Sequence, residues 1–148
     1  MKWVPGFSAS ILNAIRESKI LRIRCGAGHR FTGIWVVVVD DRVFVRPWNN
    51  KSGGWYQDFL EDPHGSIRIL EKELSVRARK ARGEHLFDKI DHGYAEKYHT
   101  PANRKYVRGF ALSRRRMTNA RIDTRECLEE DEKLALHDSG AIQDNWRD

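Results

Sequence analysis

The chain has 148 residues, 40% of them hydrophobic and 32% charged, which suits one globular domain with a core of its own. Its longest unbroken apolar run, residues 34–39, is far shorter than the roughly 20 residues that a membrane-spanning helix needs. No long apolar stretch follows Lys2, so the sequence predicts no secretory signal peptide. The two cysteines, Cys25 and Cys127, are too few for a disulfide framework. We therefore expect a soluble, cytoplasmic protein with both thiols reduced.

The net charge of +6 is unevenly distributed along the chain. Residues 1–125 hold 25 Lys and Arg against 13 Asp and Glu, whereas residues 126–148 hold 2 against 8. We expect a folded domain over residues 1–125, followed by an acidic C-terminal tail that need not be ordered. A basic body suits an anionic partner, such as a phosphorylated ligand, a nucleic acid or an acidic protein, although a well-solvated surface has the same composition.

The first 25 residues predict a helix and a strand. Ser8 is a suitable N-cap, and apolar side chains follow it at helical spacing, so we expect a helix that ends near Ser18. Apolar residues then alternate with arginine over residues 20–25, as in a strand that is buried on one face. Cys25 falls in the buried phase of this strand, which makes it a small core residue rather than a nucleophile.

The next 21 residues predict a β-hairpin. The run 31–39 is apolar and largely β-branched, so we expect one strand buried on both faces. A turn at residues 40–41 joins it to a strand over residues 42–46. The first of these strands has more apolar surface than a lone small barrel can bury, which favours a homodimer.

The second half of the chain predicts further short elements. These are a helix over residues 55–60, a hairpin with strands over 66–70 and 74–78 around a turn at 71–73, a helix over 84–98, and a last strand over 107–112. Strands that are joined by tight turns imply an antiparallel sheet. Five or six such strands hide their edges most economically by closing into a barrel. The expected fold class is therefore mainly β with flanking helices (α+β).

Residues 46–55 carry the most chemical information. The segment leaves a strand, enters a helix, and supplies cations, a hydroxyl group and two glycines: Arg46, Lys51, Ser52, Gly53 and Gly54. Glycine lets the backbone approach a ligand, and the free N–H groups at a helix start favour an anion. Trp48 and Trp55 could border a flat ring system. The pattern predicts a phosphate site, and the alternative is a solvated loop whose two tryptophans pack into the core.

No other segment predicts catalytic or metal chemistry. No Ser or Cys has the local signature of an activated nucleophile. Three histidines, at positions 85, 92 and 99, share one helix face, but successive ones lie roughly 10 Å apart along the axis, too far to hold one metal. The run 114–116 is the densest basic stretch and could contact a nucleic-acid backbone. Without a recognised motif we favour a solvated or partner-facing stretch.

Several features match the pattern of a known superfamily. They are the loop 26–30 with its basic end, the apolar hairpin 34–45, the strand-end Arg46, the helix that opens with Trp55 and Tyr56, the Asp62-Pro63 pair, the hairpin 67–76, and the later residues Tyr94, Lys97, Tyr98 and Arg104. In these features the chain resembles the split-barrel proteins related to pyridoxamine phosphate oxidase. It is most similar to the branch of deazaflavin-dependent nitroreductases and to a nearby uncharacterised bacterial family.

The resemblance implies an antiparallel split β-barrel that dimerises and binds FMN or a deazaflavin at or near the subunit interface. The cofactor-binding residues it implies are phosphate contacts from Arg30, Arg46, Lys51 and Ser52, ring contacts from Trp48, Trp55 or Tyr56, and the neighbouring Gly53. Hydride transfer is the chemistry of the cofactor itself, so no catalytic acid or base is required of the protein.

Two departures from the superfamily pattern keep other functions open. Asp58 stands where the related reductases often have asparagine, and a carboxylate there would repel phosphate. Pro47 and Trp48 replace a glycine pair, and the indole could take the space of a cofactor. The leading hypothesis is an oxidoreductase of the nitroreductase or quinone reductase kind. The alternatives are a split-barrel binding module that has lost the cofactor, and a basic barrel that binds nucleic acid.

Overall fold

The computed structural model describes residues 7–26, 28–50 and 53–124. The elements in chain order are α1 (Ala9–Glu17), β1 (Leu21–Cys25), β2 (Thr32–Ile34), β3 (Val36–Val39), β4 (Arg42–Val45), α2 (Trp55–Glu61), β5 (His64–Ile69), β6 (Lys72–Lys80), α3 (Glu84–Lys97), the 3-10 turn η1 (Pro101–Asn103), α4 (Arg104–Phe110), α5 (Ser113–Arg116) and β7 (Ala120–Thr124). None of the helices in the described part of the chain has the length and apolar character needed to cross a membrane.

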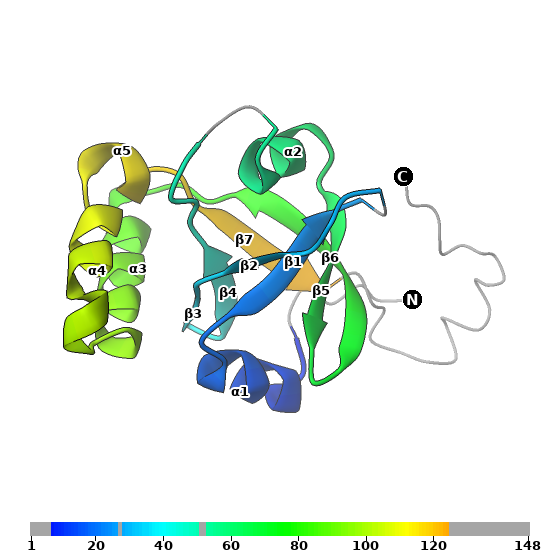
Figure 1. Cartoon of the computed structure of the whole chain (residues 1–148), viewed down its shortest axis with the longest axis horizontal. Helices are drawn as coiled ribbons and strands as arrows, with labels where there is room; N and C mark the ends of the chain where they lie inside the picture. The colour runs from blue at the N-terminus through cyan, green and yellow to red at the C-terminus, as the bar shows by residue number, and fades with distance from the viewer. Residues whose placement is uncertain (1–6, 27, 51–52, 125–148) are drawn as a thin grey trace, which may run out of the picture.

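The strands form one antiparallel sheet in the order β2-β1-β5-β6-β7-β4-β3. The two edge strands of this sheet, β2 and β3, follow one another in the chain and are separated only by Trp35. Their covalent connection brings the two edges back together, so the sheet curls into a nearly closed barrel (Figure 1). The predicted antiparallel split barrel with flanking helices is confirmed.

Two hydrophobic cores meet at the wall of the barrel. The first fills the barrel and is completed by α1 and α2, whereas the second lies outside β3 and β4, under α3 and α4. Val36 belongs to the first core and Val37 to the second, because successive side chains of a strand point to opposite faces. Two-sided burial, predicted for residues 31–39, is therefore confirmed at Val36 and Val37, whereas Thr32 and Gly33 are exposed. In Figure 1, α3, α4 and α5 stand together on one flank of the barrel.

Local sequence signals fixed several elements as expected. The Ser8 side chain accepts a hydrogen bond from the N–H of Ile11 and caps α1. Asp40 and Asp41 both have positive φ, at 53° and 62°, as the two central residues of a type I′ hairpin turn require. Helix α3 buries Phe87, Ile90 and Tyr94, as its periodicity predicts.

Two predictions for the barrel strands need correction. The segment 31–39 is two strands rather than one: at Trp35 the chain leaves its pairing with β1 and turns to pair with β4. The Trp35 ring lies flat on Tyr98, the C-cap residue of α3, with 3.9 Å between ring centroids, a contact that sequence spacing does not reveal. The second hairpin turns at Leu70 and Glu71, both with positive φ, rather than at residues 71–73.

The prediction of a last strand over residues 107–112 is wrong. Pro101 opens a 3-10 turn that leads directly into α4, a position where proline favours helix entry. The last strand of the described residues is instead β7, in which Ala120, Ile122 and Thr124 are buried on one face, while on the other face Arg121 is half-buried and Asp123 is buried. The predicted acidic tail lies outside the described residues.

Candidate functional site

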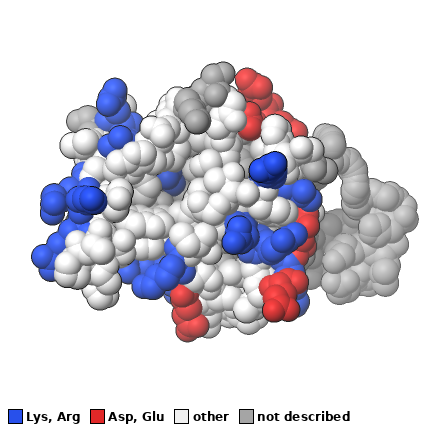
Figure 2. All heavy atoms as spheres, viewed as in Figure 1, with Lys and Arg blue, Asp and Glu red and all other residues white. Residues whose placement is uncertain are grey.

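A cleft of about 600 Å³ opens between the barrel, the start of α2 and helix α4. Its lining is mostly apolar and aromatic, with few polar groups: Ile20, Gly33, Ile34, Trp35, Arg46, Trp48, Asn49, Gly54, Trp55, Asn103, Tyr106 and Phe110. Figure 2 shows that the barrel and α4 in this view are separated by largely uncharged surface. A concave, apolar cleft with a few placed polar groups is the usual form of a small-molecule site. We call it the aromatic cleft.

Aromatic rings from three parts of the chain build one side of the aromatic cleft. Trp35, between β2 and β3, presents its ring edge-on to Phe110 and to Tyr106, with centroids 5.7 and 6.3 Å apart. Trp48 packs edge-on against Tyr106 at 5.7 Å and tilted against Phe110 at 5.5 Å. Such interlocked rings give a rigid wall, and a rigid wall preorganises a site for a flat ligand.

Trp48 is held against α4 by contacts on both sides of its ring. The Arg115 guanidinium lies 3.8 Å from the centre of the ring, and its Nε donates to the Trp48 carbonyl oxygen. On the helix side, a Cβ atom built at Gly109 would meet the ring at 2.4 Å. Trp48 therefore forms one wall of the aromatic cleft and leaves its volume open.

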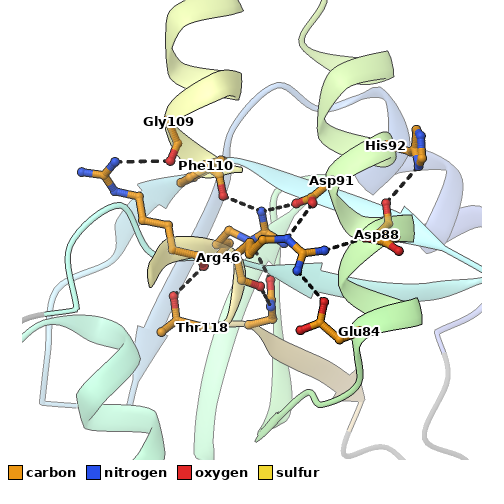
Figure 3. A network of polar contacts seen from close by, with 11 residues as sticks. Arg46, Glu84, Asp88, Asp91, His92, Gly109, Phe110 and Thr118 are labelled. Carbon is orange, nitrogen blue, oxygen red and sulfur yellow. Dashed lines mark hydrogen bonds and ion pairs between the residues drawn. The ribbon is translucent and has the colours of Figure 1, made fainter. Parts of the chain in front are cut away.

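Among the described residues, Arg46 is the only cation that lines the aromatic cleft, and it is 1% exposed. Arg46 comes two positions after Phe44, so its side chain lies on the same outer face of β4, under the helices. Its Nε donates to Asn119 Oδ1, and its Nη1 donates to Asp91 Oδ1 and to the Phe110 carbonyl oxygen, each at 2.7 Å (Figure 3). Its Nη2 is buried and has no hydrogen-bond partner among the described residues.

Asp91 extends this network to the basic run 114–116. Its second carboxylate oxygen accepts from Arg116 Nε at 3.0 Å, and Arg116 also bonds Glu84 and Asp88 (Figure 3). The three acids are spaced by four and three residues on α3 and so share one helix face. Arg116 is neutralised by these three acids, and Arg115 contacts Trp48. Two of the three arginines that could have contacted a nucleic-acid backbone therefore stabilise the fold instead.

The structure brings together only some of the predicted site residues. Arg46, Trp48 and Trp55 line the aromatic cleft. Gly53 is exposed and directly precedes Gly54, which lines the cleft. Arg30 is exposed and does not line the cleft. Tyr56 points into the barrel core. Lys51 and Ser52 lie outside the described residues.

Sequence reasoning missed Trp35, Asn103, Tyr106 and Phe110. Tyr106 and Phe110 are four residues apart, so they would have shared a face had the segment been interpreted as a helix.

Two residues singled out from the sequence, Asp58 and Cys25, lie outside the lining of the aromatic cleft. Asp58 is on α2 with a carboxylate oxygen 3.9 Å from His29 Nδ1, and it is not part of the lining. Cys25 is buried, its thiol donates to the Asp62 carbonyl oxygen, and burial raises its pKa to about 12, which fits the predicted core role. Among residues 7–26, 28–50 and 53–124, no three His, Cys, Asp or Glu side chains could share a metal ion.

Residues 12–122 match the model of one family, described as "Uncharacterized protein conserved in bacteria (DUF2255)". The chain belongs to this family. The predicted similarity to an uncharacterised bacterial family is thereby confirmed. No curated protein matches the chain.

Solved structures of three proteins share its fold at low sequence identity. One is an F420-H2 dependent reductase (FDR-A), 18% identical, covering 71% of this chain and 93% of its own, with a TM-score of 0.52. Another is a FAD-binding protein from Mesorhizobium loti, 12% identical, covering 81% and 91%, with a TM-score of 0.53. A third is a putative pyridoxamine 5'-phosphate oxidase from Listeria innocua, 10% identical, covering 78% and 89%, with a TM-score of 0.51. These similarities establish the split-barrel fold.

Proposed function

We propose that the aromatic cleft binds the ring system of FMN or a deazaflavin, and that the protein is an oxidoreductase of the nitroreductase or quinone reductase kind. The observation that carries this proposal is a buried guanidinium, Arg46, with one nitrogen lacking a partner in the lining of an aromatic cleft. The fold is shared with a FAD-binding protein and an F420-H2 dependent reductase, which makes such a ligand the natural first candidate.

The residues present fit such a ligand. A buried N–H donor without a partner costs about 1–3 kcal/mol, and a ligand acceptor would recover this free energy. The carbonyl oxygens of a flavin-type ring are acceptors of this kind. Because Asp91 already offsets the charge of Arg46, a neutral carbonyl suits the remaining nitrogen as well as an anion does.

The loop that follows Trp48 remains the proposed phosphate contact. Lys51 and Ser52 supply a cation and a hydroxyl group, and Gly53 and Arg30 are exposed. When bound, the cofactor supplies the hydride transfer. The protein's part is to hold the ring between Trp48 and Trp55, to orient it through Arg46, and to exclude water with its apolar walls.

We also propose that the protein is a homodimer. The original reason does not hold, because Val36 and Val37 are buried within one chain. A better reason is the rim of the aromatic cleft, where Ile20, Trp48 and Tyr106 are 49%, 39% and 44% exposed. A second copy that covers this apolar rim would close the site. Light scattering at micromolar concentration should give twice the chain mass, and a monomer would contradict the proposal.

Cofactor titration tests the function directly. Purified protein should bind FMN or a deazaflavin saturably, with a shift in cofactor absorbance. Trp55→Ala should weaken that binding by about three- to tenfold, the usual worth of an aromatic contact. Leu60→Ala is the matched control, since Leu60 lies on the same helix, is exposed, and does not line the aromatic cleft.

The same titration separates the alternatives. Faster oxidation of the reduced cofactor by a quinone in the presence of the protein supports an oxidoreductase. Tight binding without such acceleration favours a binding module that carries the cofactor. Absence of binding to both cofactors would exclude the oxidoreductase and leave a module for another ligand.

A further inference from the structure

A second cavity, of about 250 Å³, lies on the outer face of the barrel and shares no lining residue with the aromatic cleft. It is bounded by β4, β6, β7 and the start of α3, and five of its lining residues are cations: Arg42, Arg79, Lys80, Arg82 and Arg121. The apolar part of its lining includes Phe44 and Leu86. We call it the basic cavity.

Strand register concentrates the positive charge of the basic cavity. Arg79 on β6 lies directly opposite Arg121 on β7, and Arg121 lies opposite Phe44 on β4. Two like charges that face each other across neighbouring strands destabilise a sheet. The Asp123 carboxylate relieves part of this cost by accepting from Nε of Arg121 and from Nε and Nη2 of Arg79.

The acids of the described residues near the basic cavity do not neutralise it. Asp123 is shared by two arginines, and both terminal nitrogens of Arg121 remain without a hydrogen-bond partner among the described residues. Asp40, the one acid in the lining, is paired with Lys89 at 2.9 Å. The side chains of Arg42, Lys80 and Arg82 form no hydrogen bond or ion pair with the described part of the chain. An excess of positive charge therefore faces one small, partly apolar hollow.

We propose that the basic cavity binds a small phosphate ester. Guanidinium groups match the oxygens of a phosphate two at a time, and several cations that converge on one point suit a dianion. The apolar floor at Phe44 and Leu86 accommodates the organic part of an ester, which inorganic phosphate lacks. This site is independent of the cofactor proposed for the aromatic cleft.

Calorimetric titration of the full chain with ribose 5-phosphate, in a phosphate-free buffer, tests the proposal. The ester should bind at one site per chain and more tightly than inorganic phosphate, while ribose alone should not bind. Arg42→Gln should weaken binding of the ester about tenfold or more, the usual effect of losing one charge-assisted hydrogen bond. Because the Arg42 side chain forms no hydrogen bond or ion pair with the described residues, this variant should keep nearly the stability of the wild type.

Arg68→Gln is the matched control. Arg68 is an exposed arginine on the same sheet and faces another arginine, Arg22, across β5 and β1, but it lines neither cavity. It removes the same charge and should leave binding of the ester unchanged, as should Trp55→Ala in the aromatic cleft. Equal weakening by Arg42→Gln and Arg68→Gln would reduce the effect to general charge attraction and overturn the proposal. So would the absence of wild-type binding, or equal affinity for inorganic phosphate.

Discussion

Arg46 shows how one side chain can serve the fold and the candidate site together. Its Nε and Nη1 tie the end of β4 to Asp91 on α3, to the carbonyl oxygen of Phe110 at the end of α4, and to Asn119 just before β7. The composition of the loop predicted Arg46 as a ligand contact, but composition does not reveal that two of its three nitrogens are engaged internally. Only Nη2 is left for a ligand.

Because Arg46 stabilises the fold through its Nε and Nη1 atoms, its substitution should lower the stability of the protein. Arg46→Met leaves Asn119 Oδ1 and the Phe110 carbonyl oxygen buried without a donor, and removes one of the two cations on Asp91. Breaking a buried pair on one side costs about 3–5 kcal/mol, and we expect the lower end because the Asp91 side chain is 23% exposed. Urea denaturation should show this loss in the free energy of unfolding. Arg22→Gln, on the exposed face of β1, should change it by less than about 0.5 kcal/mol; a similar loss there would contradict the assignment.

At the scale of elements, the close packing of α4 against Trp48 depends on Gly109. The ring of Trp48 occupies the space next to Gly109 that a larger residue would fill. Gly109→Ala must therefore displace the ring from its position between α4 and Arg115, although alanine itself favours a helix by about 1 kcal/mol. We expect a changed tryptophan emission spectrum and weaker cofactor binding in the aromatic cleft.

Gly93→Ala on α3 is the control for this substitution. A Cβ atom there would lie 3.4 Å from the nearest atom of Val37, close to ordinary contact. The helix propensity should then stabilise the protein by up to about 1 kcal/mol, with the emission spectrum unchanged. An unchanged spectrum in Gly109→Ala as well would show that Trp48 is not held against α4.

The C-terminal end of α3 predicts an unusual dependence of stability on pH. Lys97 Nζ donates to the carbonyl oxygens of Ile15 and Val36, and burial lowers its pKa from 10.5 to about 8. Between pH 8 and 10.5, the unfolded chain holds a proton that the folded protein has released, so stability rises with pH. The Tyr98 hydroxyl, which donates to Lys19 and accepts from the Val36 N–H, behaves oppositely. Burial raises its pKa from 10 to about 12, so stability falls over that interval.

Urea denaturation at intervals of pH tests this prediction. The free energy of unfolding should rise from pH 8 to about 9, level off where the unfolded Cys25 thiol begins to release a proton that the folded protein keeps, and fall above about pH 10. Lys97→Met should remove the rise, and Tyr98→Phe should lessen the fall, although Cys25 and Tyr94, whose pKa values burial also raises, keep part of it. A rise that persists in Lys97→Met would belong to another group.

The elements that the sequence predicted correctly are those decided by local pattern. Alternation identified β1, and helical spacing identified α1 and α3. The errors occurred where tertiary contacts decide. The break at Trp35 depends on a ring that stacks on a helix more than 60 positions later in the chain. The residues of α4 were assigned to a strand, so Tyr106 and Phe110 were not recognised as part of the site.

At the scale of the whole molecule, β7, the last strand that the structure describes, lies in the interior of the sheet. Strand β7 pairs with β4 on one side and with β6 on the other. It therefore joins the two halves of the sheet. The barrel is completed by a strand that ends at Thr124, one residue before the predicted boundary of the domain.

The final prediction is that residues 126–148 are dispensable for the barrel. Truncation after Arg125 keeps β7 with both of its neighbours, so the melting temperature should stay within about 4 °C of that of the full chain, equivalent to about 1 kcal/mol or less. Circular dichroism should then show one cooperative transition. Truncation after Thr118 is the contrasting variant, since it removes β7 and should abolish that transition. Any shift in the first variant should shrink at high salt if it arises from lost attraction between the acidic tail and the basic body. A fall of more than about 10 °C that persists at high salt would show that the tail packs against the domain through apolar contacts.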